Sequence, residues 1–122
     1  MVFNDKVFEI IVNSQDEIIV AGRFSSFNGV SSNARSVAKI SSSGVFNQVF
    51  SDNLDVSYGN KTANSGFNDI AYALALDEDD NIYIGGSFSI FKGIAYNANG
   101  VAKLSSTGVF NEEFSDNLDV TP

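Results

Sequence analysis

The chain alternates between short apolar runs and polar clusters, and this order occurs twice. Residues 7–12 and 71–76 form apolar runs that are short and end at polar clusters, which favours strands over helices. After a cluster rich in Asn, Asp and Ser, a second run follows at 18–22 and 82–86, rich in β-branched and aromatic residues and ending on glycine. Because Asn and Asp side chains bond nearby backbone groups, each cluster predicts a hairpin turn.

Two more strands are predicted in each half of the chain. Val-Ala-Lys runs at 37–40 and 101–104 lead through Ser-rich turns into Val-Phe-Asn runs at 45–50 and 109–114. Each half is therefore predicted to be a four-stranded antiparallel meander, and the fold class to be all-β. The polar connection at 24–36 retains two phenylalanines that recur in the other half, which predicts that this loop folds back and packs.

The two halves are copies of one repeat. Residues 1–58 align with 65–122 without a gap, with 28 identical residues in 58 positions. A repeat of this period is typical of architectures in which one unit cannot bury its apolar surface alone and stacks on its neighbour. We therefore expect one domain made of a first unit, residues 1–64 including a linker, and a second unit, residues 65–122.

Small residues within the strands carry packing predictions. Gly22 and Gly86 recur at the same repeat position, which suggests a β-bulge or a close backbone approach where a Cβ would clash. In the second unit, strict alternation places the three alanines of the strand at 71–76 on one face. A face of such small residues suits a crowded position.

The order of motifs resembles one class of repeat. Each unit reads as a strand, a polar turn, I-x-I/V-G/A-G-x-F, a packed F-x-G loop, V-A-K-I/L, an S-x-G turn and F-N-x-x-F. This order is similar to that of delta-60 repeats, a class of β-propeller blade found in bacterial and phage surface proteins. The first unit departs from the pattern at Ala21, which replaces the first glycine, and lacks the Asp-Asp turn. The resemblance implies a blade and an extracellular, cell-surface or virion location, but no activity.

Two blades do not close a propeller. Propellers typically have about 4–8 blades because each sheet must be covered on both faces, and an uncovered apolar face is also an association site. Either the chain is part of a longer repeat array or several copies assemble. The register of two whole repeats favours assembly, and a family of bacterial fucose-binding lectins is built in this way. We predict a cyclic homo-oligomer, with a trimer forming a six-bladed ring favoured.

Composition narrows the function classes. The chain has 15 Asp and Glu against 7 Lys and Arg, a net charge of −8. This charge works against nucleic acid and anionic membrane surfaces as partners, because both need a basic footprint. No apolar stretch approaches the roughly 20 residues that span a bilayer, so membrane insertion is not expected. The chain has no His and no Cys, which removes imidazole bases, thiolate nucleophiles and the usual zinc ligands. We therefore predict that the protein is not an enzyme and needs no cofactor.

One turn has the spacing of a calcium loop. Asp77, Asp79 and Asn81 follow the D-x-D-x-N spacing of oxygen ligands in such loops. The glycine and the distal bidentate acid of that loop are missing, and a plain hairpin turn explains the same residues. Calcium is the one candidate ion, and both interpretations stay open.

The long loops contain candidate ligand-binding residues. Recurrence in both copies assigns the phenylalanines to the core, so positions that differ between the copies are the better candidates for contact with a ligand. These candidates are Asn28, Arg35, Lys92, Tyr96 and Asn99. Drift on a solvated surface would explain the same differences.

Three functions from different classes remain. A non-catalytic structural or interaction module, with further copies or a surface protein as its partner, follows from the repeats alone. A carbohydrate-binding lectin is the alternative, motivated by the two-blade plan and the polar loops, although the chain has no Trp. A glycosidase-like hydrolase is third, because its paired carboxylates would have to come from acids that we expect to cap turns. Those repeated acids are Asp52, Asp55, Asp116 and Asp119.

Overall fold

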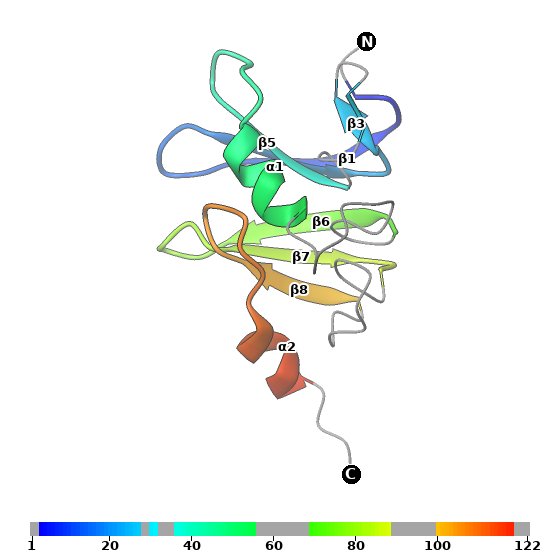
Figure 1. Ribbon diagram of the computed structural model, residues 1–122. Helices are drawn as coiled ribbons and strands as arrows, with labels where there is room; N and C mark the ends of the chain where they lie inside the picture. The colour runs from blue at the N-terminus through cyan, green and yellow to red at the C-terminus, as the bar shows by residue number, and fades with distance from the viewer. Residues whose placement is uncertain (1–2, 28–29, 32–35, 56–68, 89–99, 119–122) are drawn as a thin grey trace.

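The structure, a computed structural model, describes residues 3–27, 30–31, 36–55, 69–88 and 100–118. It contains two three-stranded antiparallel sheets stacked one on the other (Figure 1). The first sheet has the strand order β1-β2-β5, with bounds Val7–Val12, Ile18–Gly22 and Val37–Ile40. The second has the order β6-β7-β8, with bounds Ala71–Leu76, Ile82–Gly86 and Val101–Leu104. The chain is thus mostly β-sheet, as the all-β class predicts, and these strands have the predicted bounds.

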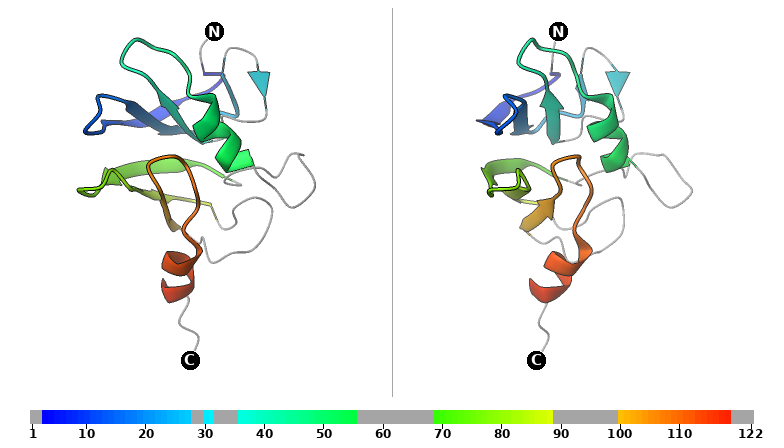
Figure 2. Two further views of the ribbon diagram at one scale, coloured as in Figure 1. Left: turned by 60° about the vertical axis from the view of Figure 1, so that its left-hand side comes forward. Right: turned by 90° about the vertical axis from the view of Figure 1, so that its left-hand side faces the viewer.

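Four smaller elements complete the described part. β3 (Ser26–Phe27) and β4 (Val30–Ser31) form a two-stranded ribbon. The helices α1 (Gln48–Asp55) and α2 (Glu112–Leu118) follow the last strand of each unit. Figure 2 shows α1 reaching from the first sheet towards the second, while α2 extends away from both sheets.

The predicted fourth strands, at 45–50 and 109–114, are wrong. Each contributes one isolated bridge to the preceding strand, and the chain then turns into a helix. The cause is a helix N-cap. The Oδ1 atom of Asn47 accepts a hydrogen bond of 2.9 Å from the backbone N–H of Phe50, and Asn111 accepts the same bond from Phe114. In α1, Phe50 and Leu54 lie four residues apart on one buried face, as an amphipathic helix requires.

The repeated acids that the structure describes lie in helices and not in turns. Asp52 and Asp55 lie in α1, and Asp116 lies in α2. Asp52 accepts a hydrogen bond of 3.0 Å from the side-chain amide of Gln48, one helical turn earlier. Asp119 lies outside the described residues.

The glycine prediction is confirmed at both positions. The register shifts in the first strand of each unit, where that strand pairs with the segment ending in Gly22 or Gly86. A Cβ on Gly22 would lie 2.2 Å from the carbonyl oxygen of Lys6, and one on Gly86 would lie 2.2 Å from that of Ile70. Each glycine therefore lets two backbones approach at a β-bulge.

This bulge also corrects the expected alanine face. Ala71 pairs with Gly86 and Ala73 pairs with Gly85, so the strand gains one residue at Tyr72. The extra residue breaks the alternation. Ala71 enters the core beside Leu74, whereas Ala73 lies on the outer side of the sheet and is exposed.

Most of the repeated phenylalanines pack as expected. Phe24, Phe50, Phe88 and Phe110 are buried, whereas Phe27, Phe46 and Phe114 are half-buried. The ring centroid of Phe27 lies 5.2 Å from that of Phe3 and 4.5 Å from that of Phe46, so the loop after β2 does fold back. Phe91 lies outside the described residues.

Candidate interaction site: the two open sheet faces

Strand pairing gives every unit two different faces. We call front face the one whose residues in the first unit are Ile19, Ala21, Val37 and Lys39, and whose equivalents 64 residues later are Tyr83, Gly85, Val101 and Lys103. We call back face the one formed in the first unit by Ile10, Ile18, Val20, Ala38 and Ile40, and in the second by Leu74, Ile82, Ile84, Ala102 and Leu104.

The front face of the first unit packs on the back face of the second. One core cluster joins Ile19 and Val37 of the first sheet to Ile82 and Leu104 of the second. The two units are therefore stacked in one direction, and unlike faces meet. Within the described part of the chain, no three-stranded sheet lies against the back face of the first unit or the front face of the second, although Phe27 of β3 packs onto the former.

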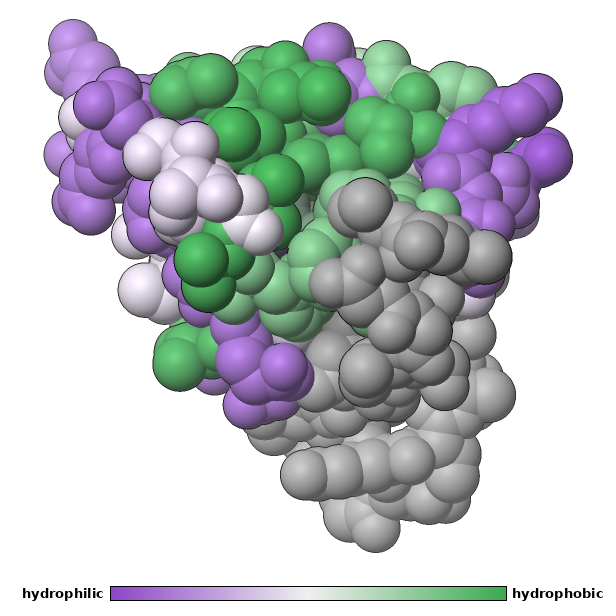
Figure 3. Space-filling model, turned by 90° about the horizontal axis from the view of Figure 1, so that it is seen from above, coloured by the Kyte–Doolittle hydropathy of each residue, from purple (hydrophilic) through white to green (hydrophobic). Residues whose placement is uncertain are grey.

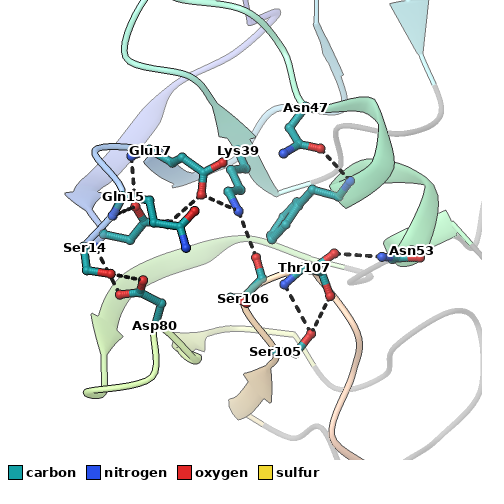
Figure 4. Close-up of polar contacts among 12 residues, drawn as sticks. Ser14, Gln15, Glu17, Lys39, Asn47, Asn53, Asp80, Ser105, Ser106 and Thr107 are labelled. Atoms are coloured by element: carbon teal, nitrogen blue, oxygen red, sulfur yellow. Dashed lines mark hydrogen bonds and ion pairs between the residues drawn. The ribbon is translucent and has the colours of Figure 1, made fainter.

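Hydrogen bonds fix this stacking, and they run from the first unit to the second. The Nζ atom of Lys39 donates a bond of 3.0 Å to the carbonyl oxygen of Ser106 (Figure 4). The side-chain amide of Asn53 donates a bond of 2.8 Å to the carbonyl oxygen of Thr107, on the same turn. Both acceptors are backbone atoms, so the shape of the turn matters more than its side chains.

Two more contacts lie along the edges of the interface. The backbone N–H of Ser14 donates a bond of 3.1 Å to the carboxylate of Asp80, and the Ser14 hydroxyl donates to its other oxygen (Figure 4). The hydroxyl of Ser36 donates a bond of 2.7 Å to the carbonyl oxygen of Asp69. Asp80 is buried beneath the first hairpin turn.

Helix α1 closes one side of the interface. The Phe50 ring lies over Gly108, where a Cβ would be 2.8 Å from the Phe50 carbonyl oxygen and 3.1 Å from its ring. Leu54, one turn further along, is 2% exposed. The Lys39 ammonium also lies 5.8 Å from the centroid of the Phe50 ring.

Three residues on the open side of the units are exposed although their equivalents are buried. Leu118 in α2 is 55% exposed although it repeats Leu54. Val101 is 44% exposed, whereas Val37, its equivalent, is fully buried. On the other open face Ile10 is 57% exposed, against 8% for Leu74. At these three positions the chain exposes apolar residues whose equivalents are buried between the units, whereas Val20 and Ala38 on the open back face stay buried.

The open back face of the first unit is partly covered. Phe24 packs over Val20 and Ala38, with half-buried phenylalanines around it. Beyond these rings Ile10 and Val12 remain exposed. Figure 3, which looks onto this face, shows hydrophobic side chains gathered across it between polar margins.

The open front face of the second unit is hollowed in two places. A shallow depression of about 200 Å³ lies over the middle of the sheet, lined mainly by Ala73, Ala75, Tyr83, Gly85 and Val101. A second hollow of about 340 Å³ lies beside Lys103 and is lined also by Asn81, Ser105, Asn111 and Glu112. The Lys103 ammonium lies 5.2 Å from the centroid of the Tyr83 ring.

The environments of Lys39 and Lys103 differ by one acidic residue. In the first unit Glu17 forms an ion pair of 2.8 Å with Lys39 and accepts a hydrogen bond of 3.0 Å from the amide of Asn13. Burial acts to raise the pKa of Glu17, but the hydrogen bonds from Lys39 and Asn13 and the lysine charge outweigh it, and the pKa is lowered. The repeat places Asn81 at this position in the second unit, so the hollow beside Lys103 is lined there by an amide in place of the acid.

The candidate calcium residues form a closed hairpin turn. The Oδ1 atom of Asp77 accepts hydrogen bonds of 2.9 Å from the backbone N–H groups of Asp79 and Asn81. Its other oxygen accepts bonds from the Asn81 amide and the Tyr83 hydroxyl. Chiefly through the Asn81 side chain, these bonds lower the pKa of Asp77. Calcium binding stays a prediction, and a calcium-dependent rise in melting temperature that Asp79→Ala removes would establish it.

The candidate ligand-binding residues cannot be compared with these faces. Asn28, Arg35, Lys92, Tyr96 and Asn99 all lie outside the described residues. Their role in binding stays a prediction.

Sequence reasoning missed the polar residues of the interface. Lys39 and Asn53 were not singled out, nor was Asp80, although all three types recur 64 residues apart. Recurrence of a charged residue within an apolar strand, as in V-A-K-I/L, was the available signal. A lysine repeated there has a structural partner more often than a surface lysine does.

No family model, curated protein or solved structure matches this chain. Among the described helices, none combines the length and the apolar character needed to cross a membrane. Within the same part of the chain, no three His, Cys, Asp or Glu side chains are grouped so that they could hold a metal ion.

Proposed function

We propose that this protein is a non-catalytic structural and interaction module that acts through its two open sheet faces. The observation that carries the proposal is the one-directional stacking of its units. The buried interface joins a front face to a back face, and one face of each kind is left open. A module of this form adds further sheets at both ends, as repeat proteins do.

The propeller is the finer part of the proposal. Each unit acts as a β-propeller blade of the delta-60 type, with three strands and a helix in place of the fourth strand. Further copies complete the ring, and three copies giving six blades are favoured. Location on a bacterial or phage surface or appendage belongs to the same proposal, because it follows from the resemblance alone.

The chemistry of the chain supports a structural role over catalysis. Without His or Cys, the carboxylate pair of a glycosidase is the acid–base arrangement to be weighed here. The repeated Asp52 and Asp116 lie in helices that share the sequence F-S-D-N-L. Asp52 is engaged by Gln48. This is the pattern of helix-surface residues.

A glycan array and hydrolysis assays on aryl glycosides test the proposal together. We expect no saturable glycan binding and no turnover above the buffer, with a known lectin and a known glycosidase as positive controls. Saturable binding that is lost in Tyr96→Ala and in Asn99→Ala would replace the proposal with a lectin. Turnover that persists through purification and is lost in an Asp variant would replace it with a hydrolase.

A further inference from the structure

We infer that a second copy of this chain docks head to tail, the back face of its first unit covering the front face of the second unit. In this complex Lys103 and Asn117 donate hydrogen bonds to the turn formed by residues 41–44 of the incoming copy. The inference rests on the proposed function, which it deepens by naming the partner. Its basis is that the chain already contains this interface once, between its own units.

The polar half of the interface is present on the open faces. Lys39 and Asn53 donate to the carbonyl oxygens of Ser106 and Thr107. The equivalent donors in the second unit are Lys103 and Asn117, and the equivalent acceptors in the first unit are the carbonyls of Ser42 and Ser43. Since the acceptors are backbone atoms, the exchange of Thr for Ser leaves them unchanged.

The two turns have the same shape. In the first unit, the Ser41 hydroxyl accepts bonds from the N–H groups of Ser43 at 3.3 Å and Val45 at 3.0 Å. In the second unit, Ser105 accepts the equivalent bonds at the same distances. The glycines that end the turns also agree, with φ of 90° at Gly44 and 95° at Gly108. The turn of the first unit therefore presents its carbonyls as the covered turn does.

The apolar contacts of the internal interface have uncovered equivalents on the two open faces. Gly108 is covered by Phe50, whereas a Cβ on Gly44 would meet nothing within 4 Å. On the other side, Phe114 and Leu118 repeat the two α1 residues that fill this position. In the docked pair, Phe114 covers Gly44 and Leu118 becomes buried. The shallow depression over Val101 receives the exposed Ile10 and Val12.

Two contacts differ between the internal and the external interface. Glu78 is the equivalent of Ser14, and Asp16 is the equivalent of Asp80. Between copies, Glu78 of one chain therefore lies against Asp16 of the incoming chain, in place of the internal hydrogen bond. Like charges placed together oppose docking. The bond from the Ser36 hydroxyl is lost because Gly100 has no side chain. Association between copies is therefore weaker than the internal stacking, and Glu78→Ser strengthens it by restoring the internal pattern.

Sedimentation velocity and native mass spectrometry of the full chain, over low to high micromolar concentration, test the inference. Val101→Glu and Ile10→Glu each place a charge on one open face, and each should weaken association about tenfold or more. Val49→Glu is the matched control. Val49 is an exposed valine outside both faces, and the second unit already carries Glu113 at this position. Circular dichroism spectra and thermal melts establish that all three variants fold.

Mixing the Val101→Glu and Ile10→Glu chains shows whether docking joins a front face to a back face or two faces of the same kind. The Val101→Glu chain keeps its back face and the Ile10→Glu chain keeps its front face, so the mixture should form a one-to-one dimer and nothing larger. Rings arise from such unlike contacts when the rotation closes, and open filaments when it does not. Both a discrete ring and a ladder of wild-type species support the docking, and a three-copy ring also supports the six-blade proposal.

Two results would overturn the inference. One is a wild-type chain that stays monomeric at every concentration while Glu78→Ser also stays monomeric. The other is an oligomer that neither face variant weakens. Either result would also remove the ring of further copies from the proposed function, whereas the non-catalytic role is tested separately by the glycan and turnover assays. Conversely, glycan binding in the array would not affect the measurement of association between copies.

Discussion

The helices α1 and α2 share the sequence F-S-D-N-L and the same N-cap, yet the environments of their leucines differ. Leu54 is 2% exposed because the second unit covers it, and Leu118 is 55% exposed. The same residues therefore form the same helix with and without a covering sheet. Local structure in this repeat is set by capping and spacing, whereas the stability that each residue contributes is set by what lies against it.

The largest contrast is expected between Leu54→Ala and Leu118→Ala. Loss of a fully buried leucine leaves a cavity, so Leu54→Ala should lower the free energy of unfolding by about 2–5 kcal/mol. Leu118→Ala should change it by no more than about 0.5 kcal/mol, because the side chain is exposed. Urea denaturation at the lowest workable concentration measures both. Equal losses would contradict the stacking of the two units.

Concentration sharpens this comparison. If copies dock as inferred, Leu118 becomes buried at high protein concentration, and Leu118→Ala should then lower the melting temperature relative to the wild type. The Leu54→Ala loss should not grow with concentration. If neither difference in melting temperature changes with protein concentration, the contrast between Leu54 and Leu118 arises within the single chain, and Leu118 is not buried by a second copy.

The turn glycines offer a second pair, with a smaller effect. Both Gly44 and Gly108 have positive φ, so replacement by alanine strains the backbone by about 1–2 kcal/mol at each position. At Gly108 the new Cβ would also lie 2.8 Å from the backbone of Phe50. Overpacking there should cost about 1–3 kcal/mol more. Denaturation of the Gly44→Ala and Gly108→Ala chains measures the difference, and an equal cost would mean that α1 does not lie over this turn.

The strands, turns and bulges of this fold could be predicted because they depend on neighbouring residues. Periodicity located β1, β2 and β5, and the recurrence of Gly22 indicated the close backbone approach. The helices were also encoded locally, by Asn47 as an N-cap and by the four-residue spacing of Phe50 and Leu54. They were missed because side chains four apart share a face in a strand as well as in a helix, and only the cap distinguishes the two.

The interface could not be predicted in the same way. Lys39 and Lys103 stand in identical Val-Ala-Lys segments, but Lys39 is buried against Ser106 and Glu17 while Lys103 borders an open hollow. Which of two identical residues is covered depends on which faces meet. The choice of faces is a property of the tertiary structure. Two identical repeat segments do not show which of them will be covered.

The free energy of unfolding should depend on pH through Glu17, and not through Asn81 at the equivalent position. The pKa of Glu17 is lowered from its ordinary value of 4.5 in the folded chain. Its contribution is therefore complete above about pH 4.5 and is lost as the pH falls through the lowered pKa, because the unfolded chain binds the proton first. Glu17→Gln should lower stability by less than about 1 kcal/mol at neutral pH and reduce its fall below pH 4.5. Asn81→Gln, the matched change at the equivalent position, should leave the pH profile unaltered in urea denaturation.

The smallest effect is expected at Ser51 and Ser115, where the two units do not differ. Both residues are fully buried in their helices, and neither hydroxyl has a hydrogen-bond partner within the described part of the chain. A buried hydroxyl without a partner keeps its desolvation cost, so its removal is nearly neutral or stabilising. Ser51→Ala and Ser115→Ala should therefore each change the free energy of unfolding by less than about 1 kcal/mol, towards greater stability. Because Ser51 lies in the covered helix and Ser115 in the uncovered one, equal results would show that the desolvation arises within each unit. A loss at Ser51 alone would instead assign its hydroxyl a role in the stacking of the units.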